Sequence, residues 1–299
     1  MLNELKREHD VDVFEGGRIS REELVARVKG VNAILSMVTE QIDGEVMEAA
    51  GPNLKIVANY AVGYDNIDVE AARKRGIVVT NTPSRLGDAV AEFTVALVLA
   101  LSRRVVEADR FMRAGRYRGW DPNLFLGVDL TGKTLGVVGP GMIGAVTGKR
   151  LQAVFEMKVV YHCRNKRQDF ETATGGKWVS LEELLKLADV VTIHVPLTAE
   201  TRHMIGVKEL AMMKREAILV NTARGAVVEE GALVDVLEGG KIWGAGLDVF
   251  EVEDARAATS LRGLNNVILT PHIASATRLA REEMTKIAVE NIMNVLRNE

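Results

Sequence analysis

The chain contains a single cysteine, Cys163, among 299 residues. One thiol cannot form an internal disulfide, and such low cysteine content is typical of a reducing compartment. The opening residues 1–8 are largely charged and lack the apolar core of a signal peptide. We therefore expect a soluble protein of the cytoplasm.

Long apolar runs and a strong charge bias are also missing. The longest apolar stretch, Ala89–Leu101, contains Glu92 and is too short to span a bilayer. The net charge of −3 gives no reason to expect nucleic-acid or membrane partners. The sequence shows no internal repeat and no low-complexity tract. Its length is ordinary for two domains, and its 47% apolar residues are enough for two cores.

A glycine-rich turn in the middle of the chain is the most informative feature that is present. Gly139, Gly141 and Gly144 form a Gly-x-Gly-x-x-Gly turn directly after the strand-like run Thr134–Val138. Strand, glycine turn and helix in this order form the dinucleotide-binding fingerprint. A helix over residues 141–155 would direct its N-terminal N–H groups at a pyrophosphate. The alternative is a strand–helix turn without a ligand, but the flanking segments favour the fingerprint.

Strand-like and helix-like segments alternate on both sides of residue 83 and predict parallel α/β architecture. The later part predicts a doubly wound, Rossmann-like sheet with strands at Leu135–Val138, Lys158–Tyr161, Val190–His194, Ala217–Val220, Gly244–Leu247 and Val267–Leu269. The earlier part predicts a smaller, flavodoxin-like α/β domain with strands at Val11–Phe14, Ala33–Ser36, Lys55–Ala58 and Ile77–Thr80. An amphipathic helix over Thr277–Leu296 ends the pattern.

Polar residues follow three of the later strands, in the segments Asn221–Gly225, Asp248–Glu253 and Thr270–Ser275. The carboxyl ends of parallel strands form the ligand crevice of an open sheet. An arginine there can bind a carboxylate bidentately, and a histidine can protonate a carbonyl oxygen while hydride reaches the carbon. A nearby carboxylate would favour the protonated histidine. The arginine, the histidine or the carboxylate alone would be interpreted as a surface or turn residue. Together they fit hydride transfer to a 2-keto acid.

These blocks resemble the D-isomer-specific 2-hydroxyacid dehydrogenases: Gly139–Gly144, Asn221–Gly225, Gly246–Glu251 and Thr270–Ile273, in that order. The resemblance covers essentially the whole chain. It implies that Arg224 binds the substrate and that His272 is the catalytic acid–base. It also implies that Glu253, rather than Glu251, is the catalytic glutamate, because the family's residue closes an Asp-Val-Phe-x-x-Glu string. The family usually has proline next, where this chain has Asp254.

The resemblance extends to the smaller domain. The segment Ala61–Asp68 is similar to the family loop whose N–H groups, here those of Val62 and Gly63, bind the substrate carboxylate. It implies a substrate-binding domain of residues 1–82 plus 277–299, with a dinucleotide-binding domain of residues 83–276 inserted in it. Family members usually open with a strand. This chain begins at the helix-like Leu2–His9, so either the small sheet lacks that strand or the start of the chain is misassigned.

Differences from other branches of the family favour a small substrate with one carboxylate. Formate dehydrogenases carry Gln at the Glu253 position, phosphite dehydrogenases carry Lys at the Val62 position, and phosphoglycerate dehydrogenases carry Arg near Ser36–Val38. The glyoxylate/hydroxypyruvate reductase branch is most similar. A phosphoglycerate-type dehydrogenase, or a dinucleotide-sensing scaffold without turnover, is the alternative. The apolar segment Trp120–Gly127 and the resemblance predict a homodimer, although the segment could instead pack on its own domain.

Cofactor preference can be argued from the end of the second strand. An acidic residue about 20 positions beyond the glycine turn would bind the ribose of NAD, but that count reaches Arg164. Arg164 and Lys166 could pair with a 2′-phosphate, so NADP(H) is favoured and NAD(H) is the alternative. We expect no metal site. The expected cofactor-binding residues are Gly139, Gly141, Met142, Ile143, Gly144, Cys163, Arg164, Asn165, Lys166, Val195, Pro196, Thr222, Ala223, Asp248, His272, Ile273 and Ala274.

Overall fold

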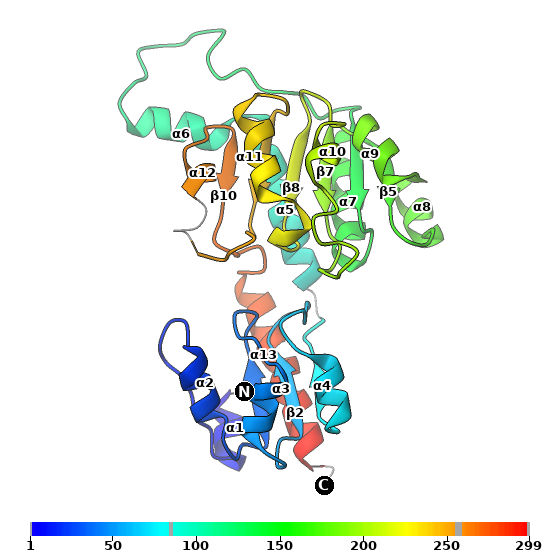
Figure 1. Ribbon diagram of the computed structural model, residues 1–299. Helices are drawn as coiled ribbons and strands as arrows, with labels where there is room; N and C mark the ends of the chain where they lie inside the picture. The colour runs from blue at the N-terminus through cyan, green and yellow to red at the C-terminus, as the bar shows by residue number, and fades with distance from the viewer. Residues whose placement is uncertain (1, 84–85, 255–258, 298–299) are drawn as a thin grey trace. The chain divides into compact units, whose positions relative to one another are not determined.

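The structure is a computed structural model that describes residues 2–83, 86–254 and 259–297 (Figure 1). The chain folds as two compact units. Unit 1 comprises Met1–Leu86 and Ala276–Glu299, and unit 2 comprises Gly87–Ser275. Each unit is described by itself below.

Unit 2 is built on a sheet of seven parallel strands in the order β10-β9-β8-β7-β4-β5-β6. The order reverses at β4, which places β5 on one side and β7 on the other, as in a Rossmann sheet. The doubly wound sheet predicted from the sequence is therefore confirmed. The two-residue edge strand β6 was not predicted. The strands are β4 (Thr134–Val138), β5 (Lys158–His162), β6 (Lys177–Trp178), β7 (Val190–Ile193), β8 (Ile218–Asn221), β9 (Gly244–Leu247) and β10 (Val267–Leu269).

Helices cover both faces of this sheet, so the central strands are apolar on both sides. Alternate residues of a strand enter different cores. Val137 packs with Leu151 and Tyr161 on one face, and Val138 packs with Leu184 on the other. The first face is covered by α5 (Leu86–Ser102), α7 (Met142–Phe155) and α8 (Gln168–Thr174), and the second by α9 (Leu181–Leu187), α10 (Val207–Leu210), α11 (Glu230–Glu238) and α12 (Thr259–Arg262).

Two smaller features complete unit 2. The short 3-10 helix η1 (Gly225–Val227) follows β8. The helix α6 (Val105–Arg113) follows α5 and leads into a long loop, which Figure 1 shows extending away from the sheet. This loop contains Trp120, whose exposed fraction is 83%.

Unit 1 has a three-stranded parallel sheet in the order β1-β2-β3 among the described residues. The prediction of a strand at Val11–Phe14 is wrong, because this segment is irregular. Asp12 forms an ion pair with Arg27, and the Arg27 guanidinium lies 5.3 Å from the centre of the Phe14 ring. These contacts tie the segment to α2, while Val11 packs against the small core under β2 without pairing as a strand. The elements are α1 (Leu2–Glu8), α2 (Arg21–Arg27), β1 (Ala33–Ser36), α3 (Gly44–Ala50), β2 (Ile56–Asn59), α4 (Val69–Lys74), β3 (Val78–Thr80) and α13 (Arg278–Arg297).

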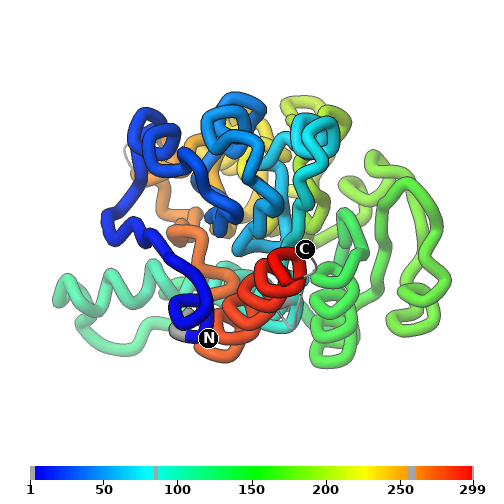
Figure 2. The backbone as a smooth tube through the Cα atoms, turned by 90° about the horizontal axis from the view of Figure 1, so that it is seen from below, coloured from blue at the N-terminus to red at the C-terminus, as the bar shows by residue number. Residues whose placement is uncertain are grey.

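The first and last helices, α1 and α13, lie side by side in unit 1, as Figure 2 shows. Leu5 of α1 joins Val289 and Ile292 of α13 in a small core under β2. At the rim of this contact, Arg297 lies 2.8 Å from Glu8. Across the part of the chain that the structure describes, no helix is both long and apolar enough to cross a membrane.

Candidate active site

The three glycines after β4 have different surroundings. Gly139 has a φ of +88°, and a Cβ atom there would lie 2.7 Å from the Val195 side chain. A Cβ atom on Gly144 would lie 2.4 Å from the Gly139 carbonyl oxygen. Around Gly141, by contrast, no atom lies within 4 Å of such a Cβ. The outer glycines therefore make the tight turn and the close helix–strand packing, while the middle one leaves open space for a ligand.

The open space lies at the N-terminus of α7. Gly141 is the N-cap and provides no side-chain hydrogen bond to the first N–H groups. Met142 and Ile143 open the helix, and Val195 and Pro196 follow the neighbouring strand β7. A helix N-terminus with free N–H groups binds phosphate groups well. The residues present therefore fit the pyrophosphate of a dinucleotide.

The segment after β5 is exposed and basic. The Cys163 thiol donates to the Asn165 carbonyl oxygen at 2.8 Å, which makes a tight turn. Lys166 lies 5.7 Å from the centre of the Trp178 ring, and the Arg164 side chain is exposed. Asn165 and Lys166 are exposed as well. The turn therefore presents cations at the carboxyl end of β5, where a Rossmann sheet receives the adenosine ribose.

The remaining cation of this segment is already neutralised. Arg167 lies 2.7 Å from Asp169. The hydrogen bond from Arg167 lowers the pKa of Asp169 to about 2. Asp169 therefore stays ionised and paired. Among the described residues, Arg164 and Lys166 form no ion pair within 4 Å, although Arg164 helps to lower the pKa of Glu200.

Asp248, directly after β9, organises the segment after β10. The carboxylate is fully buried and accepts hydrogen bonds from the Thr270 hydroxyl at 2.7 Å, the Ile273 N–H at 2.9 Å and the Ala274 N–H at 2.7 Å. The His272 N–H donates to the Asp248 carbonyl oxygen at 2.9 Å. His272 itself has a φ of +54°, a conformation that residues with side chains rarely adopt. Asp248 thus holds His272 in a strained turn.

His272 faces a glutamate from the loop after β9. Its Nδ1 atom lies 3.3 Å from Glu253 Oε1, and both side chains are about one-third exposed. Glu251, two residues earlier, lies 2.9 Å from His203 instead. The structure therefore brings Glu253 and His272 together and directs Glu251 elsewhere.

Arg224 follows the third strand of this edge, β8. Its carbonyl oxygen accepts a hydrogen bond from the buried Asn221 side chain at 2.9 Å, and Asn221 also accepts from the Ala223 N–H at 3.0 Å. The Thr222 hydroxyl lies 3.0 Å from the Thr94 hydroxyl of α5. Arg224, Glu253 and His272 thus follow the neighbouring strands β8, β9 and β10 at the edge that also carries the glycine turn.

The predicted substrate loop lies in unit 1. The Val62 carbonyl oxygen accepts from the Asn81 side chain at 2.7 Å, and the Gly63 carbonyl oxygen accepts from the Asn59 side chain at 2.7 Å. Asn59 is fully buried and also bonds Asn66. Among the described residues, the N–H groups of Val62 and Gly63 donate no hydrogen bond. Two N–H groups are therefore held on a fixed loop with their hydrogens unused.

Sequence reasoning missed the asparagines that shape these loops. Asn59, Asn66 and Asn221 are each at most 4% exposed, although asparagine is usually a surface residue. The available signal was a polar residue ending an otherwise apolar strand, as at Asn59 in β2 and Asn221 in β8. A buried asparagine at such a place has to satisfy its amide locally, and the backbone of the following loop provides the partners.

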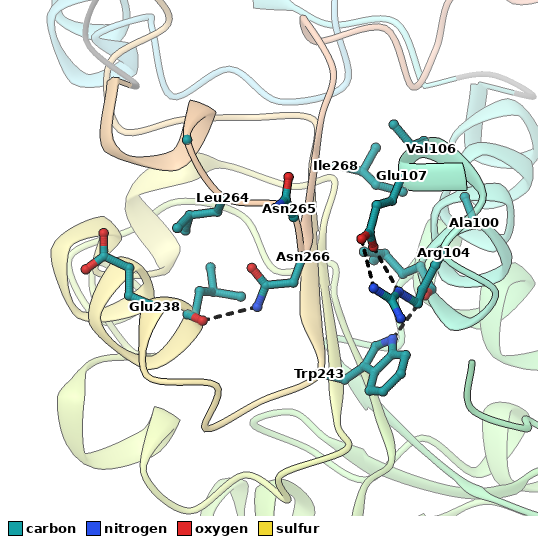
Figure 3. Close-up of a pocket in the computed structure, with 13 residues that line it drawn as sticks. Ala100, Arg104, Val106, Glu107, Glu238, Trp243, Leu264, Asn265, Asn266 and Ile268 are labelled. Atoms are coloured by element: carbon teal, nitrogen blue, oxygen red, sulfur yellow. Dashed lines mark hydrogen bonds and ion pairs between the residues drawn. The ribbon is translucent and has the colours of Figure 1, made fainter. Parts of the chain in front are cut away.

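A cavity of about 580 Å³ in unit 2 lies apart from these residues (Figure 3). Trp243 and Asn266, which line it, immediately precede β9 and β10. The cavity therefore lies at the amino edge of the sheet. Figure 3 shows Arg104 and Glu107 paired on its wall, and their side chains lie 2.8 Å apart. It contains none of the predicted site residues.

The fold and the glycine turn define an NAD(P)-binding oxidoreductase. The family model of the D-isomer specific 2-hydroxyacid dehydrogenase NAD-binding domain matches residues 95–274. The chain is 50% identical to the glyoxylate reductase of Thermococcus litoralis over 280 residues, which cover 92% of this chain and 84% of the relative. The chain belongs to the D-isomer-specific 2-hydroxyacid dehydrogenase family and is an NAD(P)-dependent enzyme of that family.

Solved structures agree with this assignment. A crystal structure of a protein from Thermus thermophilus has a TM-score of 0.93 and 47% identity, covering 100% of this chain and 94% of that one. The NADPH-dependent glyoxylate/hydroxypyruvate reductase of Sinorhizobium meliloti, solved with NADP and malonate, has a TM-score of 0.84 and 35% identity. That match covers 98% of this chain and 88% of the relative. The family and the reaction class predicted from the sequence are confirmed.

Proposed function

We propose that this enzyme reduces glyoxylate, and similarly small keto acids such as hydroxypyruvate, to the D-2-hydroxy acids, with NADPH as the preferred donor. The observation that carries the chemistry is the His272–Glu253 pair, with 3.3 Å between Nδ1 and Oε1, at the edge of the sheet that carries the glycine turn. The choice of substrate is supported by the names of the relatives, which include glyoxylate reductase at 50% identity.

His272 is the proposed general acid. Because its Nδ1 atom faces Glu253, its Nε2 atom is left to protonate the keto oxygen of the substrate. When bound, the reduced nicotinamide supplies the hydride. Glu253 fixes the orientation of the ring and balances its charge. The Asp248 hydrogen bonds keep the His272 turn in place before the substrate arrives, which is the form of preorganisation that catalysis requires.

The substrate carboxylate is assigned to three groups. Arg224 provides a planar fork of N–H donors, which suits a carboxylate better than an ammonium would. The unused N–H groups of Val62 and Gly63 are the other proposed donors, and residues 1–82 plus 277–299 form the proposed substrate-binding domain. Glyoxylate needs no further charged partner, because it carries one carboxylate only.

The dinucleotide is assigned to the residues around the carboxyl edge of unit 2, within the proposed domain of residues 83–276. The glycine turn and the α7 N-terminus bind the pyrophosphate, and Arg164 and Lys166 bind the 2′-phosphate that distinguishes NADPH from NADH. The complete proposed set is Gly139, Gly141, Met142, Ile143, Gly144, Cys163, Arg164, Asn165, Lys166, Val195, Pro196, Thr222, Ala223, Asp248, His272, Ile273 and Ala274.

We also propose a homodimer. The long loop after α6 exposes 83% of Trp120 and 58% of Leu126. Its root is well held, because the Arg104 guanidinium lies 5.1 Å from the centre of the Phe125 ring. One end of this loop is anchored, and its exposed apolar side chains would be more stable buried against a second copy of the chain than in water.

The substrate proposal is tested by steady-state oxidation of NADPH with a panel of keto acids. We expect the highest kcat/KM with glyoxylate, followed by hydroxypyruvate, and a much lower value with 3-phosphohydroxypyruvate, whose phosphate has no assigned cation. A preference for the phosphorylated acid would replace the proposal with a phosphoglycerate-type activity. NADPH binding without turnover of any keto acid would indicate a dinucleotide sensor.

A further inference from the structure

We infer that Glu251 is a positioning residue that sets the contact between Glu253 and His272. The inference rests on the proposed function, because it concerns the same reaction. The relevant contacts form what we call the Glu251 bracket, which consists of Glu251, His203 and Glu230. None of these three residues is among the proposed catalytic or binding residues.

The bracket fixes both the side chain and the backbone of Glu251. Glu251 Oε1 lies 2.9 Å from His203 Nε2 and accepts a hydrogen bond from the Glu230 N–H at 3.0 Å. In return, the Glu251 N–H donates to Glu230 Oε2 at 3.2 Å. Glu230 is the first residue of α11, whose N-cap Glu229 makes no side-chain capping bond. Glu251 thus supplies the cap of α11 from a distant part of the chain, and a carboxylate is favoured at a helix N-terminus.

His203 is itself held by the segment that follows Arg224. Its N–H donates to the Ala226 carbonyl oxygen at 2.8 Å, and its φ of +52° turns the chain sharply. Two residues later, Ile205 forms a parallel bridge with Val228. The segment that carries the His203 imidazole is therefore hydrogen-bonded to the residues that directly follow Arg224, the proposed carboxylate-binding arginine.

A direct backbone contact joins the same two segments. A Cβ atom on Gly225 would lie 1.8 Å from the carbonyl carbon of Phe250 and 2.4 Å from the Glu251 nitrogen. No side chain can therefore stand at the residue after Arg224. The main chain next to Arg224 is therefore in direct contact with the main chain that leads to Glu253.

Val252 and Glu253, which follow the bracket, are only partly buried. Val252 is 56% exposed, and the Glu253 side chain is 38% exposed. Packing holds the start of this loop, where Val249 is 1% exposed, and three polar contacts hold Glu251 two residues before Glu253. The 3.3 Å separation between Glu253 and His272 thus depends on the bracket.

The test is the substitution Glu251→Ala in the full-length enzyme. We expect kcat/KM for glyoxylate to fall about ten- to hundredfold, because a shift of about 1 Å at a reacting group can cost that much. The dissociation constant of NADPH should stay unchanged. Glu251→Gln keeps an acceptor for the Glu230 N–H and should recover most of the lost activity.

A double-mutant cycle separates positioning from a merely structural effect. If Glu251 acts through Glu253, then Glu251→Ala should lower kcat/KM by less than about threefold in a Glu253→Gln background. If Glu251→Ala does not fold, as judged by circular dichroism, His203→Ala replaces it in the cycle. That variant removes one contact of the bracket and leaves the α11 cap, so a smaller loss with the same non-additivity is expected.

Asp189→Ala is the matched control. Asp189 also accepts from a backbone N–H, that of Thr134 at 2.8 Å, and from a cationic side chain, Lys214 at 2.9 Å, but it precedes β7 at the opposite edge of the sheet. This variant should lower Tm without changing kcat/KM. Two results would overturn the inference but leave the proposed function intact. One is that the losses of kcat/KM from Glu251→Ala and Glu253→Gln multiply in the double variant. The other is a folded Glu251→Ala enzyme with wild-type kcat/KM. A wild type without turnover would overturn the proposed function as well.

Discussion

Two histidines, one in the proposed site and one in the Glu251 bracket, have an unusual backbone conformation. His203 and His272 both have φ values above +50°, and non-glycine residues with positive φ are uncommon in folded proteins. Strain of this kind persists only when surrounding contacts outweigh it, and here Asp248 provides those contacts for His272. The sequence predicts that His272 follows a strand. It does not predict the positive φ of His272, because that conformation results from tertiary hydrogen bonds.

The proposed preference for NADPH rests on two residues, Arg164 and Lys166, and gives the first prediction. Arg164→Asp combined with Lys166→Ala should lower the ratio of kcat/KM with NADPH to kcat/KM with NADH about ten- to hundredfold. A hydrogen bond to a charged group contributes about 1.5–3 kcal/mol, and because Arg164 and Lys166 are both exposed, we expect the two losses together to amount to about that much. The measurement is kcat/KM for both reduced cofactors in wild type and variant.

Arg167→Ala is the control for this prediction. It removes a cation from the same segment, but one that already pairs with Asp169 at 2.7 Å. The cofactor ratio should therefore stay within about threefold of the wild-type value, because the control removes no free phosphate partner. A wild-type enzyme that prefers NADH would show that the basic turn does not bind the 2′-phosphate of NADPH.

At the scale of elements, the residue directly after β7 is a histidine that packs behind the glycine turn. His194 is half-buried, and its buried Nε2 atom has no hydrogen-bond partner among the described residues. Burial lowers the pKa of His194 to about 3. A Cβ atom on Gly144 would lie 3.1 Å from the His194 ring, so there is no room for solvent between them. His194 is therefore neutral in the folded protein and has a role in packing.

This burial predicts a loss of stability in mild acid. The unfolded chain binds a proton at His194 below about pH 6.5, whereas the folded protein does not until the pH approaches 3. His194 therefore lowers the free energy of unfolding by about 1.4 kcal/mol for each pH unit in that window, or about 2 kcal/mol between pH 6.5 and 5. His194→Leu should remove this part of the slope, as measured by urea unfolding at pH 7, 6 and 5. An unchanged slope would mean that His194 gains its proton without unfolding.

The sequence predicted the elements of unit 2 well, because periodicity is informative where strands are apolar throughout. Six of its seven strands were expected, and the two-residue β6 was too short to give a pattern. In unit 1, Val11–Phe14 has the apolar character of a strand, yet the Asp12–Arg27 ion pair draws it to α2. A long-range ion pair of this kind leaves no local signal. The pairing of Glu251 with His203 was hidden for the same reason, since 48 positions separate them.

At the scale of the molecule, the exposed apolar residues in the loop after α6 lead to a prediction about oligomeric state. Sedimentation at micromolar concentration should show a dimer. Trp120→Ser combined with Leu126→Ser should shift it toward monomer, because each apolar side chain loses burial of about 1.5–3 kcal/mol. Val207→Ser, which changes an apolar side chain that is 64% exposed on α10, is the control and should leave the dimer intact. A wild-type monomer would refute the homodimer.

The central claim is that His272 protonates a small keto acid, and one comparison tests it most directly. The kcat for NADPH oxidation with glyoxylate should fall about 10²–10⁴-fold in His272→Ala, because that is the range of general acid catalysis. NADPH should still bind, as measured by fluorescence titration, since the glycine turn and the basic segment are unchanged. A variant that binds NADPH and keeps more than about half of the wild-type kcat would contradict the account, because a general acid contributes far more than that.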